Sequence, residues 1–380
     1  MTPAWWIVIK KVNDFDSSVL AFSRHPDFAR VRNFPTSALG SMRNRVFIAR
    51  ASHFFPFLEV LGSNGIPYER KLRRFGLPTL RTEQSDEYVV VPAVDRFISH
   101  IVDQAGLIDL PKLVTERIRY NQLSQQVLAT IDHCPTTWSR LELFGELMPL
   151  ECNEFRCRLV QQGDSTRFCV DIQNYAGMPE SRYTEWNTAM IVVTIVRDKL
   201  GQDWLPTEVG LRTSHQLPVE SIGEFAGCKV SYGQHCIYVT APTQDLARPV
   251  SFLDATHSTS SETVTKILNE DEYLGLPGSL KMALRPHLRN GIPNVGLASE
   301  ICETSPRTMQ RELQKSRSSF RQILAELQFE LAADLLRDPT LKIGDIGREV
   351  GFDDPSHFVR SFRRISGTTP TEYRRASICE

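Results

Sequence analysis

The spacing of apolar residues changes near residue 276, and this change divides the chain into two parts. Before it, runs that alternate apolar and polar residues stand beside runs with an apolar residue every three or four positions. Alternation is typical of half-buried strands, and steps of three and four are typical of amphipathic helices. From residue 280 onward only the helical spacing remains. The pattern therefore predicts an α+β N-terminal domain followed by an all-α C-terminal domain.

Four segments of the first part have the strand pattern. Residues 154–160 and 166–172 both alternate, and the residues between them favour a turn, so these segments are expected to form a β-hairpin. A second pair is expected at 227–232 and 235–240, around a turn at Gly233. The chain contains no phosphate-binding loop, dinucleotide fingerprint, GxSxG or HExxH motif. The strands are therefore better explained as the shell of a pocket than as a catalytic scaffold.

One long helix is expected between the two strand pairs. Over 183–200, apolar side chains recur at steps of three and four, and Gly201 follows as a stop. Together with the strands, the helices complete an α+β domain without an internal repeat. Other segments with helical spacing lie at 51–61, 94–105, 113–131 and 136–148.

The segment 241–279 has the composition of a linker. It is rich in Pro, Gly, Ser and Thr and has little continuous apolar pattern, although a short helix is expected at 262–273. An ordered surface loop would have the same composition. With this segment as the divider, the expected domains are residues 1–240 and residues 280–380.

A first helix-turn-helix unit is expected after Asn294. This residue can cap one short helix, and Ser305 with Pro306 can start the next helix, 306–316. A short helix, a tight turn and a second helix with a polar face are the layout of a DNA-binding unit. The polar faces carry the residue types that bind guanine and adenine edges in a major groove: Arg307, Gln310, Arg311 and Gln314.

A long helix, 319–337, is expected to join this unit to a second one. Its apolar positions recur at steps of three and four, which predicts one buried stripe along the helix. A helix of this length would fix the spacing between the two units. The stripe consists of Phe320, Leu324, Leu327, Leu331 and Leu335.

The second unit repeats the plan of the first. A short helix precedes a turn at Gly351, and an acidic cap followed by Pro starts the final helix, 355–365. Phe358, Phe362 and Ile365 are expected to face inward. The exposed side of the helix then carries Ser356, His357, Arg360 and Arg364.

Charge supports this assignment because it is segregated along the chain. The formal net charge of −1 excludes a uniformly basic nucleic-acid coat protein. Residues 304–325 and 355–378 each hold five basic residues against one acidic residue, whereas 326–354 hold eight acidic and three basic residues. An arginine on a helix surface is usually only solvated, but two basic helices of the same layout match the sites of phosphate neutralisation.

With these caps, turns and basic helices, the chain resembles the DNA-binding domain of AraC-type (AraC/XylS) transcriptional regulators over about residues 280–375. Two positions depart from the family pattern. Glu303 stands where the first turn usually has Gly, and Gly347 stands where the second unit usually has Ala. The most specific run of the resemblance is Gly351-Phe352, Pro355-Ser356, Phe358, Arg360, Phe362-Arg363-Arg364, Gly367, Pro370 and Tyr373-Arg374.

The N-terminal part is similar to the large effector domain of the subgroup related to ornithine-utilisation regulators. The resemblance implies a ligand-sensing or dimerising role and leaves the effector-binding residues unknown. We expect a bacterial, cytoplasmic homodimer that binds operator DNA and a small-molecule effector, with RNA polymerase as a further partner. The residues that carry the resemblance are the helix at 182–200, Trp204-Leu205-Pro206, Val209, His215, the Phe225-Ala-Gly segment and Leu246.

The cysteines bear on the alternative functions. Eight Cys are scattered without a CxxC pair, which favours buried apolar roles. A metal site of Cys152 and Cys157 with His133 or His235 matches no standard zinc spacing, so no metal, cofactor or catalytic residue is expected. The main alternative is a DNA-targeted enzyme or alkyl-transfer repair protein, which would need an activated Cys.

Two further expectations complete the interpretation. A protein-interaction adaptor with a vestigial DNA domain is a third alternative, which gains from Glu303 and Gly347. The apolar run from Trp5 to Ile9 is too short for a membrane span and has charge after it instead of before it, so it predicts neither a signal peptide nor membrane association.

Overall fold

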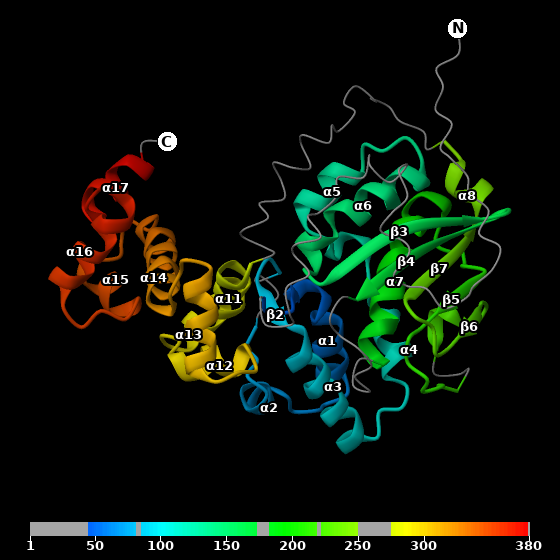
Figure 1. The fold of residues 1–380 in the computed structure, drawn as a ribbon, viewed down its shortest axis with the longest axis horizontal. Coiled ribbons are helices and arrows are strands. Elements are labelled where there is room, and N and C mark those ends of the chain that lie inside the picture. The colour runs from blue at the N-terminus through cyan, green and yellow to red at the C-terminus, as the bar shows by residue number, and fades with distance from the viewer. Residues whose placement is uncertain (1–44, 81–84, 173–181, 219–221, 250–274, 379–380) are drawn as a thin grey trace, which may run out of the picture.

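The computed structural model describes residues 45–80, 85–172, 182–218, 222–249 and 275–378, which form two regions (Figure 1). An N-terminal α+β region is joined to a smaller, all-helical C-terminal region, as the apolar spacing predicted. Within the described residues, no helix is long and apolar enough to cross a membrane. The short helix expected at 262–273 lies outside the described residues.

The N-terminal region contains a five-stranded sheet in the order β3-β4-β7-β5-β6. The hairpin of β3 and β4 is confirmed, and Gln162 pairs with Ser165 across a two-residue turn. The expected hairpin of the last two strands is wrong, because β5 pairs with β7 on one side and with β6 on the other. The strands are β3 (Phe155–Gln162), β4 (Ser165–Ile172), β5 (Glu208–Gly210), β6 (Lys229–Ser231) and β7 (Ile237–Pro242).

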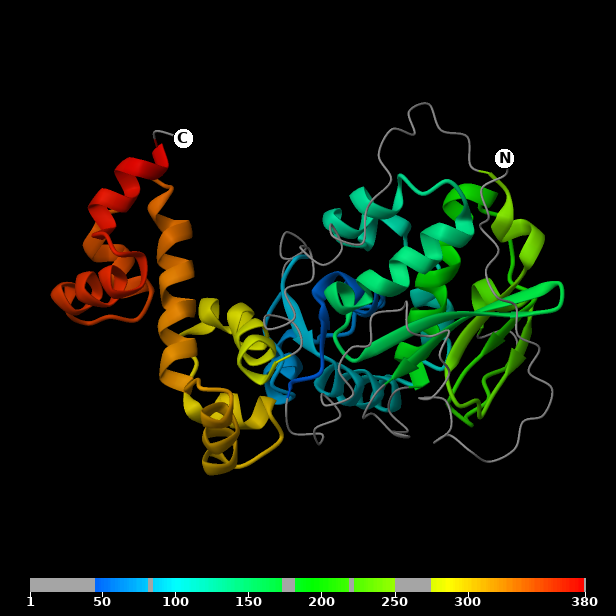
Figure 2. The same cartoon turned by 45° about the horizontal axis from the view of Figure 1, so that its top comes forward.

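Helices α6 and α7 pack against this sheet (Figures 1 and 2). The expected long helix is confirmed as α7, Arg182–Leu200, and Gly201 follows it with a left-handed φ of 98°. The single helix expected at 113–131 is wrong, because Arg119 is extended and the Ser124 hydroxyl starts a new helix by accepting the Val127 N–H at 3.2 Å. The other elements are η4 (Ala51–His53), α1 (Phe55–Ser63), α2 (Glu69–Arg74), α3 (Val91–Ala105), α4 (Leu110–Thr115), η6 (Tyr120–Gln122), α5 (Gln125–Ile131), α6 (Thr137–Glu151), η9 (Gly223–Phe225) and α8 (Thr243–Ala247).

A small second sheet lies where the two regions meet. Strand β1, Ile48–Arg50, pairs antiparallel with β2, Tyr88–Val90, with Ile48 opposite Val90. Each strand has only three residues, which is too short for an alternating pattern of apolar and polar residues to be recognised in the sequence. This sheet forms part of the surface on which the C-terminal region rests.

The ends of the expected linker, 241–279, belong to regular elements instead. Strand β7 continues to Pro242 and α8 follows directly, because Leu246 is buried in the N-terminal core. At the other end α11 begins at Leu276, inside the expected linker. The C-terminal helices are α11 (Leu276–Leu284), η10 (Arg285–Asn290), α12 (Val295–Ile301), α13 (Pro306–Lys315), α14 (Phe320–Leu336), α15 (Ile343–Glu349), α16 (Pro355–Ser366) and α17 (Pro370–Ile378).

The apolar interior is divided within the C-terminal region. A continuous core runs from the N-terminal sheet through Leu280 of α11 to Leu313 of α13 and Leu327 of α14. A separate core holds the second unit together, and the aromatic rings of Phe358 and Phe362 lie within it. Helix α14 contributes to both cores, so the single expected stripe is wrong for most of its members: only Leu327 is buried, and the other four are half-buried. The buried residues of α14 are Ile323, Ala325, Leu327, Ala332 and Leu336.

Candidate DNA-binding surface and effector pocket

The first helix-turn-helix unit consists of α12, α13 and the turn between them. The Asn294 side chain accepts the Leu297 N–H at 2.9 Å and begins α12, as expected. The Ser305 hydroxyl accepts the Thr308 N–H at 3.2 Å and begins α13. Met309 and Leu313 of α13 are buried, so the opposite face of the helix is left to solvent. The four predicted contact residues are all exposed: Arg307, Gln310, Arg311 and Gln314.

Helix α13 has its positive charge partly balanced by one acid. Arg311 lies 3.3 Å and Lys315 lies 2.9 Å from carboxylate oxygens of Glu312. The hydrogen bond from Lys315, followed by the charges of Lys315 and Arg311, lowers the pKa of the Glu312 carboxyl. Arg307 carries no such pair within the described residues, so it presents its full charge to a phosphate or base.

The second unit consists of α15, α16 and the turn between them. The Asp354 carboxylate accepts the Ser356 N–H at 2.9 Å and begins α16. Phe358 and Phe362 face inward as expected, but the inward placement of Ile365 is wrong, since 37% of its side chain is exposed. Ile365 lies at the last turn of α16, beside the hollow next to Ala325. The four predicted contact residues are exposed: Ser356, His357, Arg360 and Arg364.

The structure shows what surrounds Glu303 and Gly347, the two departures from the family pattern. Glu303 adopts a left-handed φ of 49° in the first turn, and its carboxylate lies 2.6 Å from a guanidinium nitrogen of Arg96 on α3. At Gly347, the Cβ of an alanine would lie 3.0 to 3.3 Å from Phe358. Glycine therefore lets α15 approach α16 more closely than alanine would. Both units keep their helix-turn-helix geometry.

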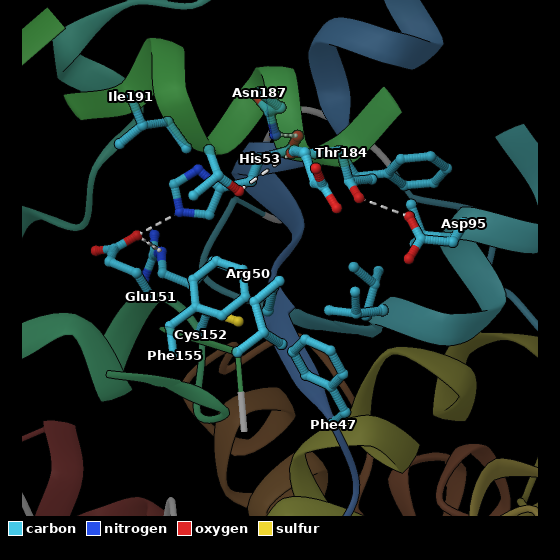
Figure 3. Close-up of a pocket in the computed structure, with 18 of the residues that line it drawn as sticks. Phe47, Arg50, His53, Asp95, Glu151, Cys152, Phe155, Thr184, Asn187 and Ile191 are labelled. Atoms are coloured by element: carbon cyan, nitrogen blue, oxygen red, sulfur yellow. Dashed lines mark hydrogen bonds and ion pairs between the residues drawn. The ribbon is translucent and has the colours of Figure 1, made fainter. Parts of the chain in front are cut away.

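The N-terminal region encloses a cavity of about 70 Å³ between η4, α1, α3, α6 and α7 (Figure 3). Its wall is mainly apolar and contains the phenyl rings of Phe47, Phe54 and Phe144 together with Met148 and Ile191. The cavity residues come from elements far apart in the sequence and form no motif. Sequence analysis therefore predicted a pocket without finding its members.

A polar group lies at one side of this cavity. The Glu151 carboxylate lies 2.7 Å from His53 Nε2 and 3.6 Å from Arg50 Nε. Burial alone would raise the pKa of the Glu151 carboxyl, but the His53 hydrogen bond and the charges of His53 and Arg50 together lower it. The Ser124 N–H also donates to Glu151, at 2.8 Å. Glu151 is thus held as a buried, ionised carboxylate.

Asn187 extends the polar group toward α7. Its side-chain nitrogen donates to the main-chain carbonyl of His53 at 3.1 Å, and Figure 3 shows His53 between Asn187 and Glu151. The Asn187 Oδ1 and His53 Nδ1 atoms are buried and have no hydrogen-bond partner among the described residues. Unpaired buried polar atoms are costly, and a ligand is one of the reasons for which they are retained.

Burial raises the thiol pKa of several cysteines, and Cys169 is an exception with a lowered pKa. Burial raises the pKa of Cys134 and Cys152, raises that of Cys228 to about 11 and raises that of Cys302 to about 12. The hydrogen bond with Cys236 is the largest cause that lowers the pKa of Cys169, to about 7. Among the described residues no three His, Cys, Asp or Glu side chains group as metal ligands would.

Two family models match the chain. The arabinose-binding domain of AraC transcription regulators matches residues 65–250, and a helix-turn-helix domain matches residues 298–376. An α+β domain followed by two helix-turn-helix units defines a two-domain helix-turn-helix protein. With both domains present in this order, the chain belongs to the AraC-type family of transcriptional regulators.

The chain is also similar to individual proteins. The ornithine utilization regulator of Pseudomonas aeruginosa is 25% identical over 181 residues, 47% of this chain and 52% of that protein, so the match spans about half of its length. An uncharacterised helix-turn-helix regulator of Mycobacterium tuberculosis is 37% identical over 79 residues, 21% of this chain and 23% of that protein. The crystal structure of the regulator CdpR from Pseudomonas aeruginosa aligns with a TM-score of 0.38 and 18% identity, covering 85% of this chain and 98% of that one.

Proposed function

We propose that this protein is a sequence-specific DNA-binding transcriptional regulator whose affinity for its operator is set by a small molecule in the N-terminal region. The observation that carries the proposal is the pair of helices α13 and α16, each with a buried apolar side and four exposed side chains suited to DNA. The two helices enter successive major grooves about one helical turn, or ~34 Å, apart. The protein acts in the bacterial cytoplasm as a homodimer and works with RNA polymerase.

Effector control is supported by one segment that contacts both the cavity and the C-terminal region. Phe47, Ala49 and Arg50, in and beside β1, line the cavity. In the same segment, the Val46 N–H donates to the Ser279 hydroxyl of α11 at 2.9 Å. A ligand that moves this segment therefore also acts on the helix that anchors the DNA-binding domain.

The segment is also fixed from the side of the cavity. Asn153 follows Cys152 in the cavity wall, and its side chain donates to the Val46 carbonyl at 2.8 Å and accepts the Ile48 N–H at 3.0 Å. Helix α11 in turn contacts α14, because the Lys281 ammonium of α11 lies 2.7 Å from a Glu330 carboxylate oxygen of α14. Contacts thus connect the cavity wall to α14, the helix that spaces the two DNA-binding units. A ligand controls DNA binding only if it prefers one arrangement of these contacts.

DNA binding is tested by charge removal on each recognition helix. We expect Arg360→Ala and Arg311→Ala each to weaken operator binding about 10- to 100-fold in gel-shift titrations, because a bidentate base contact contributes about 1–3 kcal/mol. Arg337→Ala is the matched control, since Arg337 is equally exposed but caps the end of α14. Unchanged affinity in the first two variants, with unchanged thermal stability, would exclude these helices as the DNA-reading elements.

A further inference from the structure

We infer that the cavity between α1 and α7 binds an uncharged, mainly apolar small molecule that carries one hydroxyl group, with the hydroxyl at Asn187 and His53. This inference rests on the proposed function and specifies the ligand of its regulatory site. The apolar wall indicates that most of the ligand is apolar. The unpaired polar atoms indicate where its hydroxyl group binds.

The charges on the cavity wall already have partners, which argues against a charged ligand. Arg50 pairs with Glu151 and, at 2.6 Å, with Asp86. The Glu185 carboxylate accepts the N–H groups of Arg212 and Thr213 at 2.9 and 3.0 Å. An added anion or cation would be buried against charges that are already neutralised, and burial of an unpaired charge is costly.

One further wall carboxylate fits the same picture. Asp95 on α3 is fully buried and accepts the Thr184 hydroxyl at 2.8 Å, which joins α3 to α7 across the cavity (Figure 3). This contact is part of the framework that keeps the two helices in place. An incoming ammonium group would therefore compete with an existing hydrogen bond instead of filling a vacant position.

Three buried polar atoms of the cavity-lining residues have no hydrogen-bond partner among the described residues: Arg50 Nε, His53 Nδ1 and Asn187 Oδ1. The Arg50 charge is already paired with Glu151 and Asp86, so the hydroxyl head is assigned to the other two atoms. Asn187 Nδ2 is used by the His53 carbonyl, so the remaining Oδ1 atom can only accept a hydrogen bond. His53 Nε2 faces the Glu151 carboxylate, which leaves Nδ1 to accept in the neutral ring or donate in the protonated ring. A hydroxyl has a single hydrogen, so it satisfies both atoms when the His53 ring is protonated against Glu151: it donates to Asn187 Oδ1 and accepts from His53 Nδ1–H.

The size and polarity of the wall limit the rest of the molecule. A dry apolar cavity of ~150 Å³ in another protein is large enough for benzene, whereas this one measures about 70 Å³. The cavity as it stands is therefore smaller than an unsubstituted benzene ring takes. A ligand built on a six-membered ring enters only if the wall expands, and the flexible Met148 side chain can move to make room for it. A free sugar has a hydroxyl on nearly every carbon, and most of these would be buried without partners against phenyl rings.

The test compares small probes on the full chain by thermal unfolding and calorimetry. Phenol, benzyl alcohol and cyclohexanol carry one hydroxyl; toluene lacks it; benzoate and benzylammonium are charged; L-arabinose is polyhydroxylated. At a concentration ten times its Kd, a ligand of the native state raises the Tm of a protein of this size by about 2–4 °C. We expect such a rise with at least one of the three hydroxyl compounds, a smaller rise with toluene, and none with the charged probes or the sugar.

Variants locate the site. Asn187→Leu should abolish the rise given by the hydroxyl compound and leave any rise given by toluene. Thr194→Val is the matched control, because Thr194 is an equally buried polar residue of α7 outside the cavity wall. Equal rises with toluene and the hydroxyl compounds, a larger rise with a charged probe or L-arabinose, or no rise with any hydroxyl compound would each overturn the inference. Operator binding by the unliganded wild-type chain in gel shifts would meanwhile leave the proposed DNA-binding function standing.

Discussion

The two helix-turn-helix units have the same layout but are attached to the rest of the molecule in different ways. The core of the first unit is continuous with the N-terminal region through α11, whereas the second unit has its own core around Phe358 and Phe362. In Figures 1 and 2 the first unit lies against the N-terminal region and the second lies beyond α14. A change at the cavity wall would therefore reach the first unit by direct packing, and the second through α14 and the close approach of Gly351 to Ile292.

The residues at the left-handed positions also differ between the two helix-turn-helix units. In the first unit the two left-handed positions are Glu303 and Arg317, with φ of 49° and 54°. In the second unit the corresponding positions after each helix are Gly351 and Gly367, with φ of 86° and 78°. Only glycine adopts this conformation without a steric cost. The first unit therefore depends more on its surroundings, and the second is locally more self-sufficient.

The largest expected effect tests whether the cores are separate. Phe362→Ala removes a ring that packs on Phe329, with ring centroids 4.9 Å apart, and should cost about 3–5 kcal/mol. We expect hydrogen exchange to show that the second unit opens without the N-terminal region. Leu313→Ala, in the shared core, should cost about 2–5 kcal/mol and expose amides in the first unit and in the adjoining N-terminal elements. If hydrogen exchange showed the same set of amides exposed in both variants, the molecule would have a single cooperative core.

A second prediction uses pH to separate the two units. Burial lowers the pKa of His287, in η10 beside the first unit, to about 4, and its Nε2 atom has no partner among the described residues. The native state therefore disfavours the protonated ring. Stability is complete above the unfolded pKa of about 6.5 and is lost as the pH falls toward 4, by about 3 kcal/mol.

His287→Leu should remove most of this acid sensitivity. Urea unfolding at pH 7 and pH 4.5 should give a smaller difference for the variant than for the wild type. His357→Leu is the control, because His357 is exposed on the second unit. The interpretation fails if both variants change the pH dependence equally.

A third prediction concerns the turn of the second unit. Gly351→Ala combines a left-handed φ with a Cβ only 2.3 Å from Ile292 Cγ1, and we expect it to cost about 2–4 kcal/mol. Gly367→Ala has a similar φ but no atom within 4 Å of the added Cβ, so it should cost only about 1–2 kcal/mol. The difference between the unfolding free energies of the two variants in urea is the cost of the contact with Ile292. Equal free energies would show that Ile292 moves aside without cost.

The two regions also differ in how far the sequence could predict them. In the C-terminal region, the caps at Asn294, Ser305 and Asp354 act locally, and each was found from a few neighbouring residues. Ile365 was misplaced because its side chain borders an open hollow beside Gln322 and Ala325 of α14 instead of packing in a core. Local pattern therefore predicted the recognition helices but not every side chain on them.

The N-terminal region depends on contacts between distant residues. Strand β5 has three residues and separates two strands that sequence would pair directly. The polar group of the cavity unites His53, Glu151 and Asn187, whose partners lie about a hundred residues apart in the chain. No periodicity or motif marks such a group, because tertiary packing alone brings its members together.

The smallest expected effect concerns the contact between Glu303 and Arg96, which joins the first turn to the N-terminal region. Glu303→Gly should relieve about 1 kcal/mol of backbone strain and lose an exposed ion pair that contributes at most about 1 kcal/mol, so stability should change little at low salt. At high salt the ion pair is screened in the wild type, so the variant should become the more stable protein. Arg317→Gly is the matched comparison, since Arg317 also has a left-handed φ but forms no ion pair in the described part of the chain. It should stabilise the protein at every salt concentration, and equal salt dependence of the two variants in urea unfolding would show that the Arg96 contact contributes nothing.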